Sequence, residues 1–299
     1  MPAAIIFPYL GITIGDFPNS FELFGINIAF YGVLIAIGMV LGVLTAILRA
    51  KKTGQKVDDY IDISIAAIVA GIIGARIYYV LFKLDYYAAH PSEIFDIRQG
   101  GLAIYGGLIL GILAAWVVVR IKKLSFLKIA DTCVPGIALA QFFGRWGNFF
   151  NREAFGEYTD SLFAMQIKLS DVTGVVTDSM RENIVMVNGT EYIQVHPTFL
   201  YESFSCLLLF ILLILFRKFQ QYDGEVLLWY AGGYGLERML VEGLRSDSLM
   251  IGSSGIRVSQ LLSVLIFTVS LIILVWNRIK IYKKTSYPAG LDHNRNYSG

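Results

Sequence analysis

The run AFYGVLIAIGMVLGVLTAIL, residues 29–48, decides the class of fold, because its twenty residues contain no charged side chain. A helix of about 20 apolar residues crosses the ~30 Å hydrocarbon core of a bilayer. Four more runs are similar, and two others are apolar but interrupted by Gly, Gln or Arg. We therefore predict an all-α polytopic membrane protein with seven transmembrane helices, near residues 29–48, 61–82, 102–119, 129–150, 199–216, 226–243 and 259–276.

The composition of the chain agrees with a membrane protein. Of its 299 residues 56% are hydrophobic and 16% charged, whereas soluble domains average about 45–50% and about 25%. We predict a single membrane-embedded domain over residues 1–284 and a polar cytoplasmic tail over residues 285–299. Cys133 and Cys206 lie in apolar segments and fit neither a zinc spacing nor a disulfide framework. We expect no metal, no cofactor and no nucleic-acid partner.

The distribution of Lys and Arg predicts the orientation of the helices. Cations crowd RAKKTGQK (residues 49–56), RIKKLSFLK (120–128) and NRIKIYKK (277–284), whereas residues 1–48 contain none and residues 151–197 contain three. Short cytoplasmic loops are enriched in Lys and Arg, which places the N-terminus outside and the C-terminus in the cytoplasm. No basic region precedes the first apolar run, and no removed signal peptide is expected.

Residues 151–197 form the longest predicted segment outside the membrane. The alternating pieces FAMQIKL (163–169) and ENIVMV (182–187), together with Asn188-Gly189, are typical of strands and a hairpin turn. We predict a small, β-rich extracytoplasmic cap between helices 4 and 5. No internal repeat is visible, which disfavours the two-halved plan of many transporters.

Polar residues within the apolar runs gather at their predicted outer ends. Arg238, Glu242 and Arg245 stand at i, i+4 and i+7, and Arg145 and Asn148 at i and i+3, so each group would share one helix face. An ionisable side chain in lipid costs on the order of 3 kcal/mol and marks a candidate functional site. Because arginine suits bidentate phosphate binding, converging arginines predict an anion site.

Glu242 and several other polar or small residues near the predicted outer ends also have purely structural interpretations. Glu242 could serve only to neutralise Arg238, and Arg76 could extend to the interface. Tyr31 could belong to an aromatic belt, and His196 could simply begin a helix. Gly106-Gly107 could allow close helix packing.

Six sequence blocks, in order, resemble one family. GRWGNFFNREAFG (residues 144–156) is similar to the signature of the prolipoprotein diacylglyceryl transferases. The resemblance continues along most of the chain in FYG (30–32), GARIYYVLF (74–82), GGLAIYGGLI (100–109), HPTFLYE (196–202) and YGLERMLVEGLR (234–245).

This resemblance implies a transferase of the bacterial plasma membrane whose active site faces the outer leaflet. It would move the diacylglyceryl group of phosphatidylglycerol to the thiol of a lipobox cysteine in a preprolipoprotein, forming a thioether and releasing glycerol phosphate. By similarity Arg145 and Arg238 are the essential arginines, and further matched positions are Tyr31, Asn148, Glu153, Gly156 and Glu242. Many members carry a histidine where this chain has Tyr105, so either the tyrosine substitutes or the histidine is not strictly the base.

The implied chemistry assigns candidate roles. The reaction breaks a carbon–oxygen bond, and arginines beside the departing phosphate would stabilise the transition state. Asn151 and Glu153 would hydrogen-bond and orient Arg145 or the hydroxyls of the lipid glycerol. Gly147 and Gly156 would let the backbone approach the lipid or turn back across the site. The candidate proton acceptors, which the sequence does not rank, are His196, Glu153, Glu242 and Tyr105.

Two other function classes fit parts of the sequence. An anion transporter or channel would also bury arginines, but near the midplane of the membrane. An intramembrane serine protease is suggested by Gly252-Ser253-Ser254-Gly255, yet only His293, in the tail, follows it. A nucleophile without a base is weak support for a protease.

Overall fold

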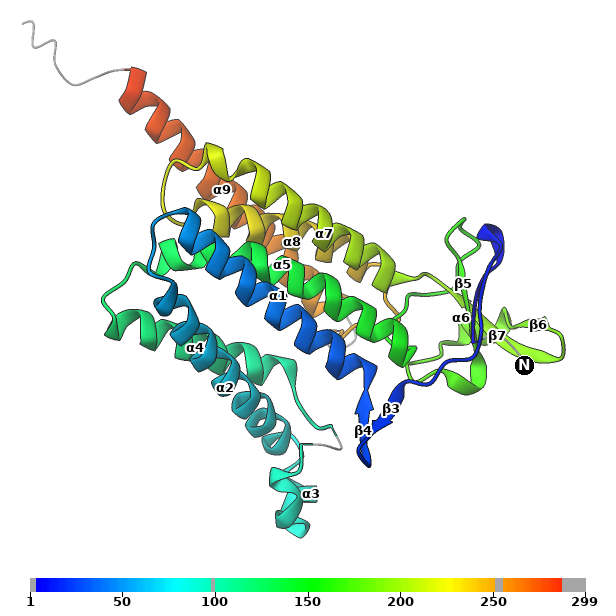
Figure 1. Cartoon of the computed structure of the whole chain (residues 1–299). Helices are drawn as coiled ribbons and strands as arrows, with labels where there is room; N and C mark the ends of the chain where they lie inside the picture. Colours follow the sequence, from blue (N-terminus) through cyan, green and yellow to red (C-terminus); the bar gives the residue numbers. More distant parts are fainter. Residues whose placement is uncertain (1–3, 98–99, 251–254, 287–299) are drawn as a thin grey trace, which may run out of the picture. The chain divides into compact units, whose positions relative to one another are not determined.

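The computed structural model describes residues 4–97, 100–250 and 255–286 (Figure 1). The predicted tail therefore lies mostly outside the described residues, as do Gly252, Ser253 and Ser254 of the protease reading. Contacts between Cα atoms divide the chain into two units. Unit 1 comprises Met1–Phe17, Arg152–Ser205 and Leu227–Gly299, and unit 2 comprises Pro18–Asn151 and Cys206–Val226.

Six helices among the described residues are long and apolar enough to cross a membrane, so the chain is a polytopic membrane protein. They are α1 (Phe30–Lys52), α2 (Val57–Leu81), α4 (Ile104–Ile121), α5 (Phe126–Asn151), α7 (Thr198–Phe216) and α9 (Val258–Ser286). The predicted sixth span does form a helix, α8 (Glu225–Glu242), but it is not among the six. The reason is its charge, since it contains Glu225, Glu237, Arg238 and Glu242.

Two closely packed helix pairs, α1 with α5 and α2 with α4, form most of unit 2 (Figure 1). In the first pair, a Cβ added to Gly42 would lie 2.8 Å from the carbonyl oxygen of Gly136. In the second pair, Gly74 and Gly106 face each other so closely that neither could carry a side chain. Small residues allow such backbone approach in membranes. Gly106 thus has the packing role that the sequence left open.

Arg76 near the end of α2 organises the loop that precedes α4. Its guanidinium donates to the backbone oxygens of Ile94 (2.7 Å), Glu93 (2.6 Å), Gly101 (2.9 Å) and Gly100 (3.1 Å). The residue is 8% exposed, so its guanidinium is enclosed by the protein. It thereby supplies hydrogen-bond donors to backbone carbonyls of η2 (Pro91–Phe95) and of the loop. The same unit contains the hairpin β3–β4 (Ser20–Leu23, Ile26–Ala29), α3 (Leu84–Ala89) and η2 (Pro91–Phe95).

A five-stranded antiparallel sheet, in the order β2-β1-β5-β7-β6, lies in unit 1. The strands are β1 (Ile5–Phe7), β2 (Ile12–Ile14), β5 (Met165–Lys168), β6 (Val185–Val187) and β7 (Thr190–Val195). The predicted β-rich segment is confirmed, including the turn, where Asn188 and Gly189 have φ of 50° and 78°. Its extent was wrong, because N-terminal residues supply β1 and β2. Short elements of this unit are η1 (Pro8–Leu10), η3 (Leu169–Asp171) and α6 (Asp178–Glu182).

Candidate functional site

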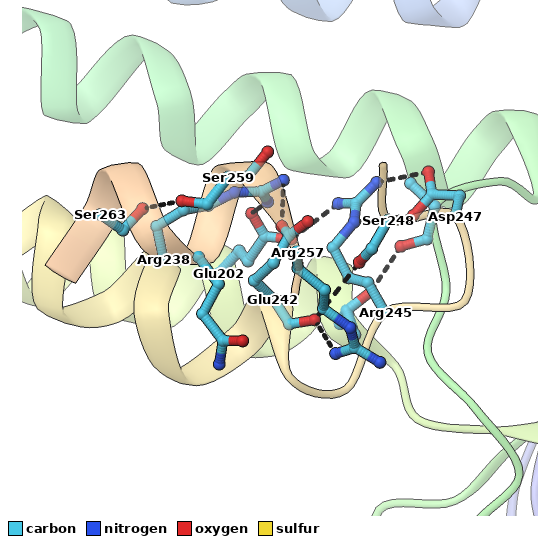
Figure 2. Close-up of polar contacts among 12 residues, drawn as sticks. Glu202, Arg238, Glu242, Arg245, Asp247, Ser248, Arg257, Ser259 and Ser263 are labelled. Carbon is cyan, nitrogen blue, oxygen red and sulfur yellow. Dashed lines mark hydrogen bonds and ion pairs between the residues drawn. The ribbon is translucent and has the colours of Figure 1, made fainter. Parts of the chain in front are cut away.

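Five charged side chains, here called the charge cluster, meet where α7 begins and α8 ends (Figure 2). Oε2 of Glu202 lies 3.2 Å from Nη1 of Arg238, and Oε1 lies 3.1 Å from Nη1 of Arg245. Oε2 of Glu242 lies 2.6 Å from Nη2 of Arg238. Asp247 accepts two hydrogen bonds from Arg245, at 2.9 and 2.7 Å. The cluster thus contains two arginines and three carboxylates, and Glu202 bridges the two arginines.

The sequence correctly grouped Arg238, Glu242 and Arg245, but the three do not form one helical stripe. Arg238 and Glu242 are one turn apart on α8, which ends at Glu242. Arg245 follows the helix and pairs with Gly156 in an isolated β-bridge. The guanidinium of Arg257, just before α9, donates to the main-chain oxygen of Glu242 (Figure 2) and ties the end of α8 to the next helix.

The two arginines of the charge cluster differ in exposure. Glu202 and Glu242 are each 1% exposed and Arg245 is 8% exposed, whereas the side chain of Arg238 is 19% exposed. Arg245 is bound by Glu202 on one side and by Asp247 on the other. The side chain of Arg238 is therefore more accessible to a ligand than that of Arg245.

Asp247 lies in the loop after α8, and two opposing effects act on its carboxyl group. Burial favours the neutral form, while the hydrogen bonds and the charge of Arg245 favour the ionised form. The effect of Arg245 prevails and holds the pKa of Asp247 below its usual range. This carboxylate consequently stays ionised, and able to bind Arg245, to a lower pH than an ordinary aspartate would.

Backbone strain surrounds Glu153 in the loop that follows α5. The residues on either side of it, Arg152 and Ala154, have φ of 52° and 55°, a region that residues with a Cβ seldom adopt. Arg152 is held by a 2.7 Å hydrogen bond to the Phe17 carbonyl, and Thr198 donates its hydroxyl to the Ala154 carbonyl. Strain that neighbours enforce in this way is common at functional sites.

Gly156 holds this loop against the residues just before α7 and just after α8. Its N–H donates to the His196 carbonyl (2.9 Å), and the next N–H, of Glu157, donates to the Leu244 carbonyl (2.8 Å). A Cβ at Gly156 would lie 2.6 Å from the Leu244 oxygen and 2.8 Å from Cβ of His196. The close approach that requires glycine is therefore to protein backbone. The loop joins the start of α7 to the end of α8.

His196 lies just before α7 and is partly buried. Its Nδ1 is 3.4 Å from the hydroxyl of Tyr201. Burial lowers the pKa of the imidazole below its usual value, because desolvation disfavours the charged form. At neutral pH this ring is therefore neutral, with one nitrogen able to accept a proton.

The remaining predicted site residues, apart from Glu153, belong to unit 2. Arg145, Asn148 and Asn151 lie in the last turns of α5 and are half-buried. The ring of Tyr31, in the first turn of α1, packs on Gly147, where an added Cβ would lie 2.5 Å from Cδ2 of the tyrosine. Tyr31 is thus brought to the segment that bears Arg145. Tyr105, in the first turn of α4, is 52% exposed. The convergence of Arg145 with the charge cluster stays a prediction.

Two residues of the charge cluster were not among the predicted site residues. Glu202 is the only acidic residue in the apolar run 199–216, and Asp247 follows Arg245 by two positions. An isolated carboxylate inside an apolar run was a usable signal for Glu202. Asp247 has no such signal, because a loop aspartate is ordinary. In the described parts of the chain, no group of His, Cys, Asp and Glu side chains could hold a metal ion.

Comparisons with known proteins agree with one another. Residues 18–276 match the family model described as prolipoprotein diacylglyceryl transferase. A curated phosphatidylglycerol–prolipoprotein diacylglyceryl transferase of Clostridioides difficile strain 630 is 47% identical over 246 residues, which cover 82% of this chain and 89% of the relative. The enzyme of that name from Finegoldia magna is 40% identical over 265 residues, covering 88% and 97%. The Staphylococcus aureus strain Newman enzyme is 41% identical over 276 residues, covering 92% of each chain.

Proposed function

Because this chain belongs to the prolipoprotein diacylglyceryl transferase family, we propose that it moves the diacylglyceryl group of phosphatidylglycerol to a lipobox cysteine of preprolipoproteins. The cysteine sulfur attacks the glycerol carbon that bears the phosphate, so a carbon–sulfur bond forms as the carbon–oxygen bond breaks. The thiol proton passes to a base, and glycerol phosphate leaves with the bonding electrons. This enzyme would thus catalyse the first step of lipoprotein maturation in bacteria.

The observation that carries the proposal is the partly exposed side chain of Arg238, whose guanidinium is held by two buried carboxylates. Negative charge grows on the phosphate oxygens as the bond breaks, and a fixed cation stabilises that charge in a site from which water is excluded. Glu202 and Glu242 orient the guanidinium before the lipid arrives. Arg238 binds the phosphate in this proposal, Arg145 is a further candidate for that role on its sequence match alone, and Arg245 is a positioning residue.

His196 is the best-supported candidate for the base among the four residues that the sequence suggested. Its imidazole is free to accept a proton at pH 7, and burial lowers its pKa, which makes it a weaker base. A thiol with a pKa of about 8.5 can still transfer a proton to it when nearby cations favour the thiolate. Tyr105 would need to lose its own proton first, since a tyrosine hydroxyl has a pKa of about 10. In this scheme Glu153, Glu242, Asn148 and Asn151 do not accept the proton. They orient the arginines or the hydroxyls of the lipid glycerol.

The topology proposed for the enzyme has seven spans, including α8, with the N-terminus outside and the C-terminus in the cytoplasm. The basic last turn of α1 supports this orientation. The pairing of Arg238 with Glu242 and Glu202 supports a membrane location for α8, because paired charges are tolerated in a protein interior. The charge cluster and the β-rich cap would then face the outer leaflet of the bacterial plasma membrane.

A direct assay tests this function. Purified full-length protein in lipid nanodiscs is incubated with phosphatidylglycerol and a lipobox peptide, and mass spectrometry follows the peptide mass. We expect a diacylglyceryl adduct on the cysteine and an equal amount of released glycerol phosphate. Arg238→Gln should abolish both products. Arg120→Gln, in the last turn of α4, should not. An unmodified peptide with the wild-type protein would contradict the proposal.

A further inference from the structure

We propose that the groove between the basic C-terminal end of α1 and the apolar C-terminal part of α7 is a second lipid site, in which Arg49 binds the phosphate of an anionic phospholipid that is not the substrate. This site lies wholly within unit 2 and shares no residue with the charge cluster. It would serve to anchor the protein to anionic lipid of the cytoplasmic leaflet.

Arg49 is a buried cation to which the described residues offer no hydrogen-bond acceptor. The residue is 6% exposed, and none of its three guanidinium nitrogens has a hydrogen-bond partner among the described residues. Leaving such a group unsatisfied in a low-dielectric environment is costly. An oxyanion from outside the chain would supply the missing acceptors.

The charges around Arg49 do not neutralise it. Arg217 repels it and Asp131 attracts it. The Oδ2 atom of Asp131 already accepts two hydrogen bonds, from Nε2 of Gln220 and from the backbone N–H of Gly224, each at 2.6 Å. Two guanidinium groups and one engaged carboxylate leave an excess of positive charge at this end of the helices.

Helix capping does not explain Arg49 either. The last carbonyls of α1 are satisfied locally, since the backbone N–H of Thr53 reaches the oxygens of Arg49 and Ala50, and its hydroxyl donates to the Arg49 oxygen at 2.8 Å. Gln55 N–H donates to the Ala50 oxygen at 2.9 Å. Lys51 and Lys52 already provide the cations that favour a helix C-terminus.

The groove that Arg49 lines has the composition of a phospholipid site. It has a volume of about 350 Å³ and lies between residues 45–52 of α1 and residues 210–215 of α7. Its charged residues are two cations, Arg49 and Lys52, and its other walls are mainly apolar, formed by Leu48, Phe210, Ile211 and Leu215. The two cations can bind the phosphate of a lipid, and the apolar wall can pack against its acyl chain. Basic pockets between transmembrane helices on the cytoplasmic side bind anionic headgroups in this way.

Native mass spectrometry of the full-length protein can test the site. The purified protein is titrated with phosphatidic acid or with neutral phosphatidylcholine, and bound lipid is counted. Arg49→Gln should weaken binding of phosphatidic acid by about tenfold or more, the effect of losing a charge-assisted hydrogen bond. Lys51→Gln removes the same charge from a neighbouring exposed position outside the groove and should bind as the wild type does.

Two further arms make the result decisive. Ile211→Trp would fill the groove while keeping Arg49, and it should also weaken phosphatidic acid binding, even if Arg49→Gln fails to fold. Inorganic phosphate in excess should not displace the lipid, because the acyl chain contributes to binding. Equal binding by the wild type and Ile211→Trp, or full displacement by phosphate, would overturn the lipid site.

Discussion

Oε1 of Glu202 lies 3.1 Å from Nη1 of Arg245, although the two residues are 43 positions apart in the sequence. Glu202 is in the first turns of α7, and Arg245 is in the loop beyond α8. The same carboxylate contacts Arg238 through its other oxygen. Glu202 is therefore the centre of the charge cluster, and its removal should affect both arginines at once.

Glu202→Gln should destabilise the protein by about 3–5 kcal/mol, the usual cost of removing one partner from a buried ion pair. Asp247→Asn should cost clearly less, because the side chain of Asp247 is 36% exposed and water can replace part of the interaction. Denaturant unfolding in detergent micelles would compare the two. A larger loss in Asp247→Asn than in Glu202→Gln would contradict the central role of Glu202.

Arg238→Lys and Arg245→Lys should separate substrate binding from positioning. Lysine keeps the charge but loses the planar fork. If Arg238 binds the phosphate, its replacement should lower kcat by roughly 10²–10³-fold, as for a lost transition-state donor, with a small change in melting temperature. Arg245→Lys should mainly lower the melting temperature, because Arg245 contacts Glu202 and Asp247. The reverse pattern would exchange the two roles.

Gly156→Ala should impair both folding and activity. The added methyl group would lie 2.6 Å from the Leu244 oxygen, so the backbone must shift, at a cost of about 1–3 kcal/mol. Gly15→Ala is the matched control in the same unit, because no atom lies within 4 Å of a Cβ there. Thermal unfolding and the transfer assay would be measured on both variants. Equal stability of the two would show that the loop can relax.

The pH dependence of the reaction should identify the base. If His196 accepts the proton, the rate falls as the pH decreases through the pKa of this imidazole, since the protonated ring cannot act. Burial lowers that pKa, so the midpoint should lie below the usual value of about 6.5. His196→Gln should remove this acidic limb, whereas Tyr105→Phe should keep it. An unchanged limb in His196→Gln would exclude His196 as the titrating base.

Cysteine labelling would check the proposed topology. Asn188→Cys, at the turn between β6 and β7, should react with a membrane-impermeant maleimide added to intact cells. Lys283→Cys, near the end of α9, should react only after the membrane is permeabilised. Labelling of both positions in intact cells would contradict the proposed orientation.

The sequence by itself determined the class of the protein and much of its local structure. Apolar runs long enough to span a bilayer predicted the helices, because the requirement for hydrogen-bonded backbone in lipid acts on each segment separately. The Asn188-Gly189 turn was likewise predictable, since it depends only on the backbone freedom of these two residues. Motif order along the chain was sufficient to indicate the family.

Only the tertiary structure decided how the charges pair. Glu202, Arg238 and Arg245 come from different segments, and no local pattern states that one carboxylate binds both arginines. The pairing of β1 with β5 was also invisible, because Ile5 and Ile167 are far apart along the chain. Local propensity cannot encode which distant partner satisfies a buried charge or a strand edge. The partner is selected during folding, when packing excludes the water that would otherwise solvate the charge or the strand edge.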